Sequence, residues 1–193
     1  MRFAALAIAA AALVATVLPA SAMEIVTGQR TSQPRGHWEL CQSRPIECTA
    51  RTRATRPVAM NDQVMGLLRS VNDRVNRAVR PMTDMQQHGV VERWSYPGTY
   101  GDCEDYVLAK RHMLLSYGFK PGDLLITVVE QANGEGHAVL TVRTSQGDFV
   151  LDNLDASVRH WTQTGYRYVK RQSERHAGTW VDIVTPNARL AMR

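Results

Sequence analysis

Two stretches of the chain repeat apolar residues with the period of a helix. The first has apolar residues three or four positions apart, with polar residues between them: Val64, Leu67, Leu68, Val71, Val75 and Val79. Asn61 or Asp62 is a suitable N-cap, and Pro81 ends this pattern. The second stretch, 102–117, is apolar around most of its circumference and is followed by Gly118. The pattern therefore predicts an amphipathic first helix and a largely buried second helix.

After the second helix, the pattern changes to short apolar and β-branched runs separated by turns. These runs predict strands over 124–129, 137–143, 149–152, 166–169 and 180–184. Helices followed by a meander of strands predict an α+β fold, with N-terminal helices packed on an antiparallel β-sheet. Pro97, Gly98 and Gly101 indicate a long loop over 82–101.

The beginning of the chain has the pattern of a secretory signal peptide. A short basic start precedes an apolar run over 4–18, and Ala20-Ser21-Ala22 matches a cleavage site. The pattern predicts a signal peptide over 1–22 and a bacterial periplasmic or secreted protein. An uncleaved N-terminal anchor is the alternative. No later stretch approaches the length of a membrane span, so we expect no stable membrane insertion after cleavage.

The rest of the chain is expected to form one domain with two appendages. Residues 23–58 lack periodicity and predict an irregular N-terminal arm, 59–185 predict the folded domain, and 186–193 a tail. The chain has 193 residues, of which 44% are hydrophobic and 21% charged, a globular composition. Its net charge of +5 is scattered along the sequence, so we expect no nucleic acid partner.

Three cysteines divide into a pair and a single residue. Cys41 and Cys48 enclose six residues including Pro45, which favours a turn. Export exposes them to an oxidising compartment, so we predict a Cys41–Cys48 disulfide, with two free thiols as the alternative. Cys103 is then unpaired, and a functional reason for this thiol is plausible.

Cys103 and two later residues could form a nucleophile, a base and an orienting group. Cys103 begins the second helix, where the helix dipole favours a thiolate and is expected to lower the thiol pKa. His137 opens one predicted strand and Asp152 closes the next. A two-residue hairpin loop at 146–147 places these two side chains on one face, and a register shift by two residues keeps them there. The alternatives are a small core cysteine and a polar edge histidine.

Three segments together resemble the bacterial transglutaminase-like cysteine proteinases. They are Gly101–Tyr106, His137–Leu140 and Leu151–Leu154, and the combination is more specific than any one of them. The helix at Val71–Asn76 and the early cysteine loop are similar too, so the resemblance covers roughly residues 36–184. It implies a papain-like, transglutaminase-like core.

The resemblance also implies roles for individual residues. Cys103 would be the nucleophile, His137 the general base and acid, and Asp152 the orienting carboxylate of a thiol-dependent peptidase that cleaves a peptide amide. LapG-type members of the family are calcium-dependent periplasmic proteases that release surface adhesins. The implied partner is therefore a protein substrate such as a cell-surface adhesin, and the implied cofactor is Ca²⁺. Asp102 and Glu104 match family residues that help to hold the ion.

Other interpretations of the same residues remain open. Asp102 could simply cap the helix, with Glu104 stabilising its first turn electrostatically. The fold could also serve a transamidase, or a noncatalytic periplasmic module that binds in a calcium-dependent way. A zinc site from Cys103, His112 and His137 has a spacing that matches no familiar ligand pattern.

Overall fold

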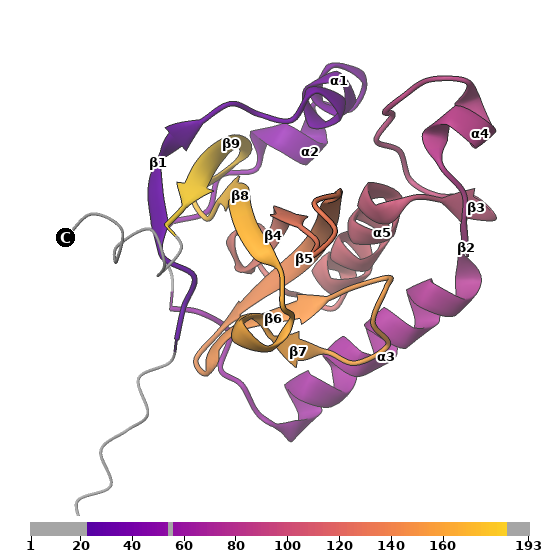
Figure 1. The fold of residues 1–193 in the computed structure, drawn as a ribbon. Helices are drawn as coiled ribbons and strands as arrows, with labels where there is room; N and C mark the ends of the chain where they lie inside the picture. Colours follow the sequence, from indigo (N-terminus) through magenta and orange to yellow (C-terminus); the bar gives the residue numbers. More distant parts are fainter. Residues whose placement is uncertain (1–22, 54–55, 185–193) are drawn as a thin grey trace, which may run out of the picture.

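The computed structural model describes residues 23–53 and 56–184, in which helices pack on an antiparallel sheet (Figure 1). The sheet has seven strands in the order β1-β9-β8-β4-β5-β6-β7. Their bounds are β1 (Thr27–Thr31), β4 (Leu124–Glu130), β5 (Gly136–Thr144), β6 (Gly147–Leu151), β7 (Arg159–His160), β8 (Arg167–Ser173) and β9 (His176–Ile183). This architecture confirms the predicted fold class. The predicted signal peptide and tail lie outside the described residues.

Two longer helices form the layer that covers one face of the sheet. Helix α3 (Asp62–Ala78) begins at Asn61, whose side chain accepts a hydrogen bond from the Val64 N–H at 2.8 Å. Helix α5 (Cys103–Ser116) ends before Gly118, which has a φ of +89°. Both helices lie close to their predicted bounds. Within the described residues, no helix is both long and apolar enough to cross a membrane.

The two faces of β5 belong to different apolar clusters. Ala138, Leu140 and Val142 pack with residues of α3 and α5 in the larger cluster. Val139 points to the opposite face, where it packs with Val150 of β6 in a second cluster. His137 alternates with the first set and shares the face of Val139. His137 and Asp152 therefore share a row with Val139 at the ends of β5 and β6, where His137 also adjoins the start of α5.

The register between β5 and β6 differs by two residues from the prediction. Thr144 pairs with Gly147, so the hairpin loop consists of Ser145 and Gln146 instead of residues 146–147. Gly147 has a φ of +98°, and a Cβ there would lie 2.8 Å from the Met23 carbonyl oxygen. Glycine is therefore suited to this position, where the strand begins. Because the shift is even, His137 and Asp152 keep a common face.

The N-terminal arm is not irregular, and this part of the prediction is wrong. It contains β1, helix α1 (Arg35–Ser43) and helix α2 (Ile46–Thr49). Strand β1 is mostly exposed and pairs with β9, beside which it lies in Figure 1. Backbone hydrogen bonds to an existing sheet edge hold such a strand, so its side chains need no apolar alternation.

The predicted loop over 82–101 also contains regular structure. Helix α4 (Asp84–His88) begins with a capping box formed by Thr83 and Gln86. Strands β2 (Arg80–Pro81) and β3 (Tyr100–Gly101) form a short parallel pair on either side of it. Two 3₁₀ helices, η1 (Pro121–Asp123) and η2 (Trp161–Gln163), complete the elements. These pieces are too short to show a periodicity in the sequence.

Candidate active site

Cys103 and His137 line one cleft at the start of α5. The cleft has a volume of about 370 Å³, and Trp94, Asp102 and Glu104 also line it. Cys103 is the first residue of the helix and is partly buried, and His137 follows the first residue of β5. The cleft therefore brings together a thiol and an imidazole that are 34 positions apart in the sequence.

Asp152 is hydrogen-bonded to the imidazole of His137. Nε2 of His137 lies 2.9 Å from Asp152 Oδ1, and both residues are buried. The Leu154 N–H donates to the same oxygen at 3.0 Å. The Asn76 side-chain amide on α3 donates to the Asp152 carbonyl oxygen at 2.8 Å. Contacts from its own loop and from α3 thus hold Asp152 in place. Because Asp152 is hydrogen-bonded to Nε2 of His137, the other ring nitrogen, Nδ1, remains available to accept a proton.

Tyr166 is a neighbour of this pair that the sequence analysis missed. Its hydroxyl donates to Asp152 Oδ2 at 2.6 Å, and its ring lies edge-on to the His137 imidazole with centroids 5.6 Å apart. Burial acts to raise the pKa of Asp152, but the hydrogen bond and charge of His137, together with the Tyr166 hydroxyl, outweigh it and hold that pKa below its usual value. The carboxyl group is therefore ionised at neutral pH.

The Cys103 thiol donates a hydrogen bond to Glu104 Oε2 at 3.1 Å. Burial raises the pKa of this thiol well above its usual value, and the charge and hydrogen bond of Glu104 raise it further. The Ala138 backbone acts in the opposite direction but is outweighed. The expectation that the helix N-terminus lowers the thiol pKa is therefore wrong for this arrangement of carboxyl groups.

Three acidic side chains converge beside the thiol. One carboxylate oxygen from each of Asp84, Asp102 and Glu104 lies within 4.8 Å of the others. Burial raises the pKa of Glu104 to about 8, with the charge of Asp102 adding to the effect, and burial also raises the pKa of Asp102. Asp102 occupies the N-cap position, but its side chain makes no capping hydrogen bond. Its Oδ1 is buried and has no hydrogen-bond partner within the described residues.

Asp84 was missed because its helix was not predicted. The capping box at Thr83 and Gln86 was the available signal, since it places Asp84 in the first turn of α4. Asp105 is not part of the cluster. One of its carboxylate oxygens accepts from the Ser95 N–H at 2.8 Å, and this contact ties α5 to the preceding loop. Asp84 is thus the third carboxylate that lies beside Asp102 and Glu104.

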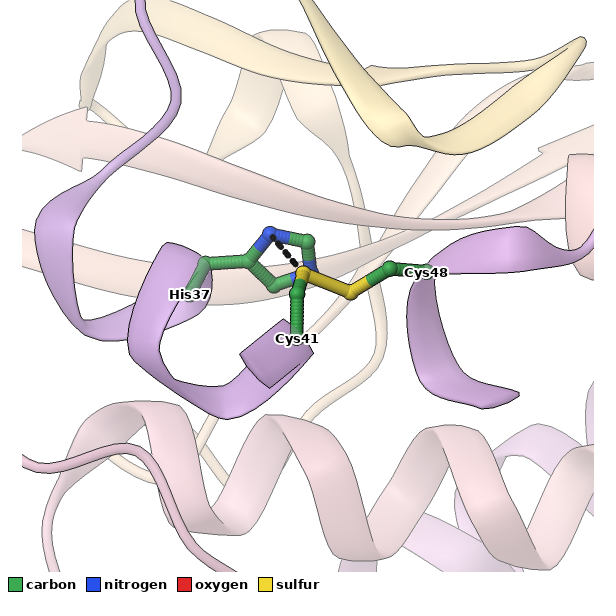
Figure 2. Close-up of side chains that lie close together, drawn as sticks. All are labelled: His37, Cys41 and Cys48. Carbon is green, nitrogen blue, oxygen red and sulfur yellow. Dashed lines mark hydrogen bonds between the residues drawn. A yellow bond between two sulfur atoms is a disulfide. The ribbon is translucent and has the colours of Figure 1, made fainter. Parts of the chain in front are cut away.

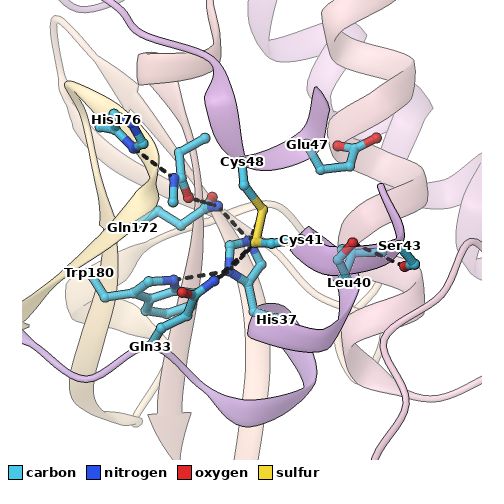
Figure 3. Close-up of a disulfide and its surroundings, with 12 residues drawn as sticks. Gln33, His37, Leu40, Cys41, Ser43, Glu47, Cys48, Gln172, His176 and Trp180 are labelled. Carbon is cyan, nitrogen blue, oxygen red and sulfur yellow. Dashed lines mark hydrogen bonds between the residues drawn. A yellow bond between two sulfur atoms is a disulfide. The ribbon is translucent and has the colours of Figure 1, made fainter. Parts of the chain in front are cut away.

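The predicted disulfide between Cys41 and Cys48 is present and joins α1 to α2 (Figure 2). The His37 ring lies against it, with Nδ1 3.7 Å from Cys41 Sγ and Nε2 3.9 Å from Cys48 Sγ. Nδ1 also accepts from the Trp180 indole N–H at 3.2 Å, in the group shown in Figure 3. The side chains of His37, Cys41 and Cys48 lie as close together as the ligands of a metal site. The two sulfur atoms are bonded to each other, however, and are not thiolates.

His37 connects the disulfide to the wall of the cleft. It packs edge-on against Trp94, with ring centroids 5.2 Å apart, and Trp94 lines the cleft. A Cβ on Gly36 would lie 2.2 Å from Trp94 Cδ1, so glycine permits this close approach. Burial, followed by the charge of Arg111, lowers the pKa of His37 to about 4, and the ring is neutral at physiological pH. Its role is in packing.

Of the three residues considered for a zinc site, His112 does not line this cleft. His112 lies mid-helix and packs edge-on against Tyr96, with centroids 5.5 Å apart. Within residues 23–53 and 56–184, no cluster of three potential ligands contains Cys103 or His137. A zinc site at these positions is therefore not supported by the geometry.

Comparisons with known proteins agree with this fold. Residues 27–188 match the family model described as bacterial transglutaminase-like cysteine proteinase BTLCP. Calcium-bound LapG of Legionella pneumophila is 23% identical, with a TM-score of 0.52 over 61% of this chain and 68% of LapG. EGTA-treated LapG is 19% identical, with a TM-score of 0.50 over 68% of this chain and 75% of LapG. At these identities the structural likeness shows the fold alone. No curated protein sequence matches significantly.

Proposed function

The chain belongs to the bacterial transglutaminase-like cysteine proteinase family and is a cysteine peptidase, and on that premise we propose that Cys103, His137 and Asp152 are its catalytic triad. One observation carries the proposal. Cys103 and His137 line the same cleft, and the His137 imidazole is hydrogen-bonded to the buried Asp152 carboxylate. A thiol, a base and an orienting carboxylate in that order are the parts that acyl transfer requires.

In the proposed mechanism, each residue of the triad has its own role. Asp152 fixes the imidazole through Nε2, so Nδ1 takes the proton from the Cys103 thiol. The thiolate attacks the peptide carbonyl, and the imidazolium returns the proton to the leaving amine. Water then hydrolyses the thioester. The Cys103 backbone N–H, at the N-terminus of α5, stabilises the oxyanion.

Trp94 does not serve as the second oxyanion donor. Its indole N–H donates to Glu92 Oε1 at 2.9 Å and is therefore engaged. The side chain acts instead as an apolar wall, packed against Trp180 as well as His37. Substrate binding in the cleft is thus supported by aromatic packing on one side and by β5 on the other.

Asp84, Asp102 and Glu104 fit a Ca²⁺ ion. Calcium takes several oxygen ligands, and these three carboxylates already converge, with one buried Asp102 oxygen that lacks a partner within the described residues. A bound Ca²⁺ ion would supply the positive charge that this cluster lacks. The calcium-bound form of the LapG structure supports this assignment. Such a site would complete its coordination with backbone oxygens or water.

The substrate is a protein, and we assign it to the bacterial cell surface. The signal sequence over 1–22 supports export to the periplasm, and family resemblance supports an adhesin or another surface protein. Hydrolysis is favoured over transamidation because the family to which the chain belongs is a family of cysteine proteinases. A labelled primary amine, added to the reaction, distinguishes the two outcomes by its incorporation into the product.

Alkylation of Cys103 tests the triad without knowledge of the substrate. Iodoacetamide should modify Cys103 faster in the wild type than in the His137→Ala variant at neutral pH, because the imidazole removes the thiol proton. Reaction in the unfolded protein provides the reference rate for a free thiol. Equal rates in the wild type and His137→Ala would mean that His137 is not the base.

A further inference from the structure

A short N-terminal segment crosses the face of the sheet that carries His137 and Asp152. We call residues 23–25 the strap. The Ile25 N–H donates to Asp148 Oδ2 at 2.8 Å, and Ile25 is buried in the same apolar cluster as Val139 and Val150. Arg171 donates to Asp148 at 3.0 Å and to the Ile25 carbonyl oxygen at 3.4 Å. The strap is therefore fixed by buried contacts at its inner end.

The outer end of the strap contacts the turn that follows β7. The Trp161 indole N–H donates to the Met23 carbonyl oxygen at 2.7 Å. The Trp161 ring packs edge-on against Tyr168 of β8, with centroids 5.4 Å apart. The Trp161 carbonyl oxygen accepts from Thr164 Oγ1 at 2.9 Å. These contacts hold η2 between the strap and β8.

The same turn leads directly to Tyr166. Gly165, with a φ of +73°, lies between Thr164 and Tyr166, and Tyr166 directly precedes β8. Its hydroxyl donates to Asp152 Oδ2, and its ring packs with the cluster that contains Ile25. The chain of contacts from the strap thus ends at the carboxylate that orients His137.

We propose that Tyr166 is a positioning residue for the Asp152–His137 pair and that the strap holds the turn from which Tyr166 extends. This inference rests on the proposed triad. Cleavage after Ala22, as the sequence predicts, would make Met23 the first residue of the exported protein. The strap would then be its N-terminus, so the new chain end itself would support the active site.

Several ionisable side chains surround Asp152, and the test must separate Tyr166 from them. They are His137 on β5, Lys110 on α5, Asp155 on the same loop, and Tyr166 and Tyr168 at the start of β8. Among them, His137 and Tyr166 are the two whose side chains hydrogen-bond to the carboxylate. Substitution of Tyr166 removes one of these bonds and leaves the charges unchanged.

The Tyr166→Phe variant, with Tyr106→Phe as its matched control, tests the positioning role. The Tyr106 hydroxyl donates to the Val79 carbonyl oxygen at 2.7 Å, so each substitution removes one hydroxyl hydrogen bond, which is buried for Tyr106 and partly buried for Tyr166. We expect Tyr166→Phe to reduce the iodoacetamide rate of Cys103 at neutral pH roughly tenfold and to move its pH profile, because Asp152 loses a donor. Tyr106→Phe should lower the thermal stability but leave the alkylation rate of Cys103 and its pH profile unchanged.

Proton NMR supplies a readout that does not depend on the chemistry of Cys103. The Nε2 proton of His137 should resonate far downfield in the wild type because it is hydrogen-bonded to a buried carboxylate. Tyr166→Phe should shift or broaden this resonance, and Tyr106→Phe should leave it in place. An unchanged resonance and an unchanged alkylation profile in Tyr166→Phe would overturn the positioning role, even if the triad itself were correct.

Trp161→Phe, compared with Trp38→Phe, tests the strap. Trp161→Phe removes the indole donor to Met23, whereas Trp38 is 53% exposed on α1. We expect Trp161→Phe to produce the same changes in the His137 resonance and alkylation profile as Tyr166→Phe, with smaller amplitude. The same His137 resonance and the same alkylation profile in Trp161→Phe and Trp38→Phe would overturn the proposal that the strap holds the turn that carries Tyr166. Failure of the triad would appear separately, as equal alkylation rates in the wild type and His137→Ala.

Discussion

Two opposing influences act on the Cys103 thiol. The N-terminus of α5 favours a thiolate, but burial and the neighbouring Glu104 carboxyl group raise the thiol pKa. The thiol donates to Glu104 Oε2, so the proposed mechanism requires this proton to pass to the His137 imidazole instead.

The Glu104→Gln variant should make Cys103 more reactive when Ca²⁺ is removed by a chelator. Glu104 is ionised above about pH 8, and there the substitution deletes a negative charge beside the thiol, so the Cys103 pKa should fall and iodoacetamide should react several-fold faster above this pH. The pH dependence of the alkylation rate measures the shift. Glu135→Gln, in an exposed turn, serves as the control. A Cys103 pKa that stays the same in Glu104→Gln would rule out this electrostatic effect.

The Asp152→Asn variant should lose most of its peptidase activity while remaining folded. An amide keeps the size of the side chain but cannot stabilise the imidazolium, so we expect kcat to fall on the order of 100-fold or more. Asp155→Asn, on the same loop, removes a carboxylate that pairs with Arg159 and should have little effect on kcat. Comparable losses in both variants would point to damage of the loop instead of loss of the orienting group.

The site was predictable at the residue scale only where side chains lie on regular elements. Strand alternation placed His137 and Asp152 on one face, and an even register shift left that conclusion intact. Tyr166 and Asp84 reach the site from a turn and from a short helix, which carry no periodic signal. The thiol pKa depends on the burial of the thiol itself and on the neighbouring Glu104 and Asp102, and this could not be predicted from the sequence.

At the scale of elements, α1 and α2 form the support for one wall of the cleft. The disulfide joins the two helices, His37 fills the space beside it, and Trp94 packs on His37. The sequence predicted the disulfide from loop length and compartment. It did not predict the helices, because α1 has nine residues and α2 four, and tertiary contacts stabilise segments of this length.

Removal of the disulfide should destabilise the fold and loosen this wall. The chain-entropy relation for a loop of this length gives about 2.5 kcal/mol for the free energy of unfolding. The Cys41→Ser/Cys48→Ser variant should therefore unfold at a lower urea concentration, with an unchanged slope. Cys103→Ser provides the control for loss of a sulfur atom outside the disulfide. Equal urea midpoints for the wild type and the double variant would contradict a stabilising disulfide.

At the scale of the whole molecule, the sheet joins segments from both ends of the described chain. Strand β1 pairs with β9, and the strap packs beneath β5 and β6. The sequence predicted an antiparallel meander but not this order, since β4 lies between β5 and β8. Edge pairing and long-range packing depend on contacts that local patterns do not encode.

The acidic cluster should make stability depend on both pH and Ca²⁺. The pKa of Glu104 in the folded state is raised to about 8, so the folded protein binds a proton that the unfolded chain releases above about pH 4.5. This contribution to stability is complete below about pH 4.5 and is lost as the pH rises through about 8. Without a cation, the protein should therefore lose stability over this interval.

Calcium should reverse this loss at high pH. A Ca²⁺ concentration of about 100 times Kd should raise Tm by about 5 °C at pH 8, and by much less at pH 5, where protons compete for the carboxylates. Thermal unfolding of the wild type and Glu104→Gln, with Mg²⁺ as the control cation, measures this effect. The same Tm gain at both pH values, or in both proteins, would place the ion elsewhere.

The most direct test of the proposed activity is a map of new N-termini on bacterial cell-surface proteins. The exported protein and its Cys103→Ala variant are each incubated with these proteins, with Ca²⁺ or with a chelator, and the new termini are identified by mass spectrometry. We predict specific new N-termini that require both Cys103 and Ca²⁺. The same set of N-termini with the wild type and with Cys103→Ala would contradict the assignment of Cys103 as the nucleophile of a peptidase.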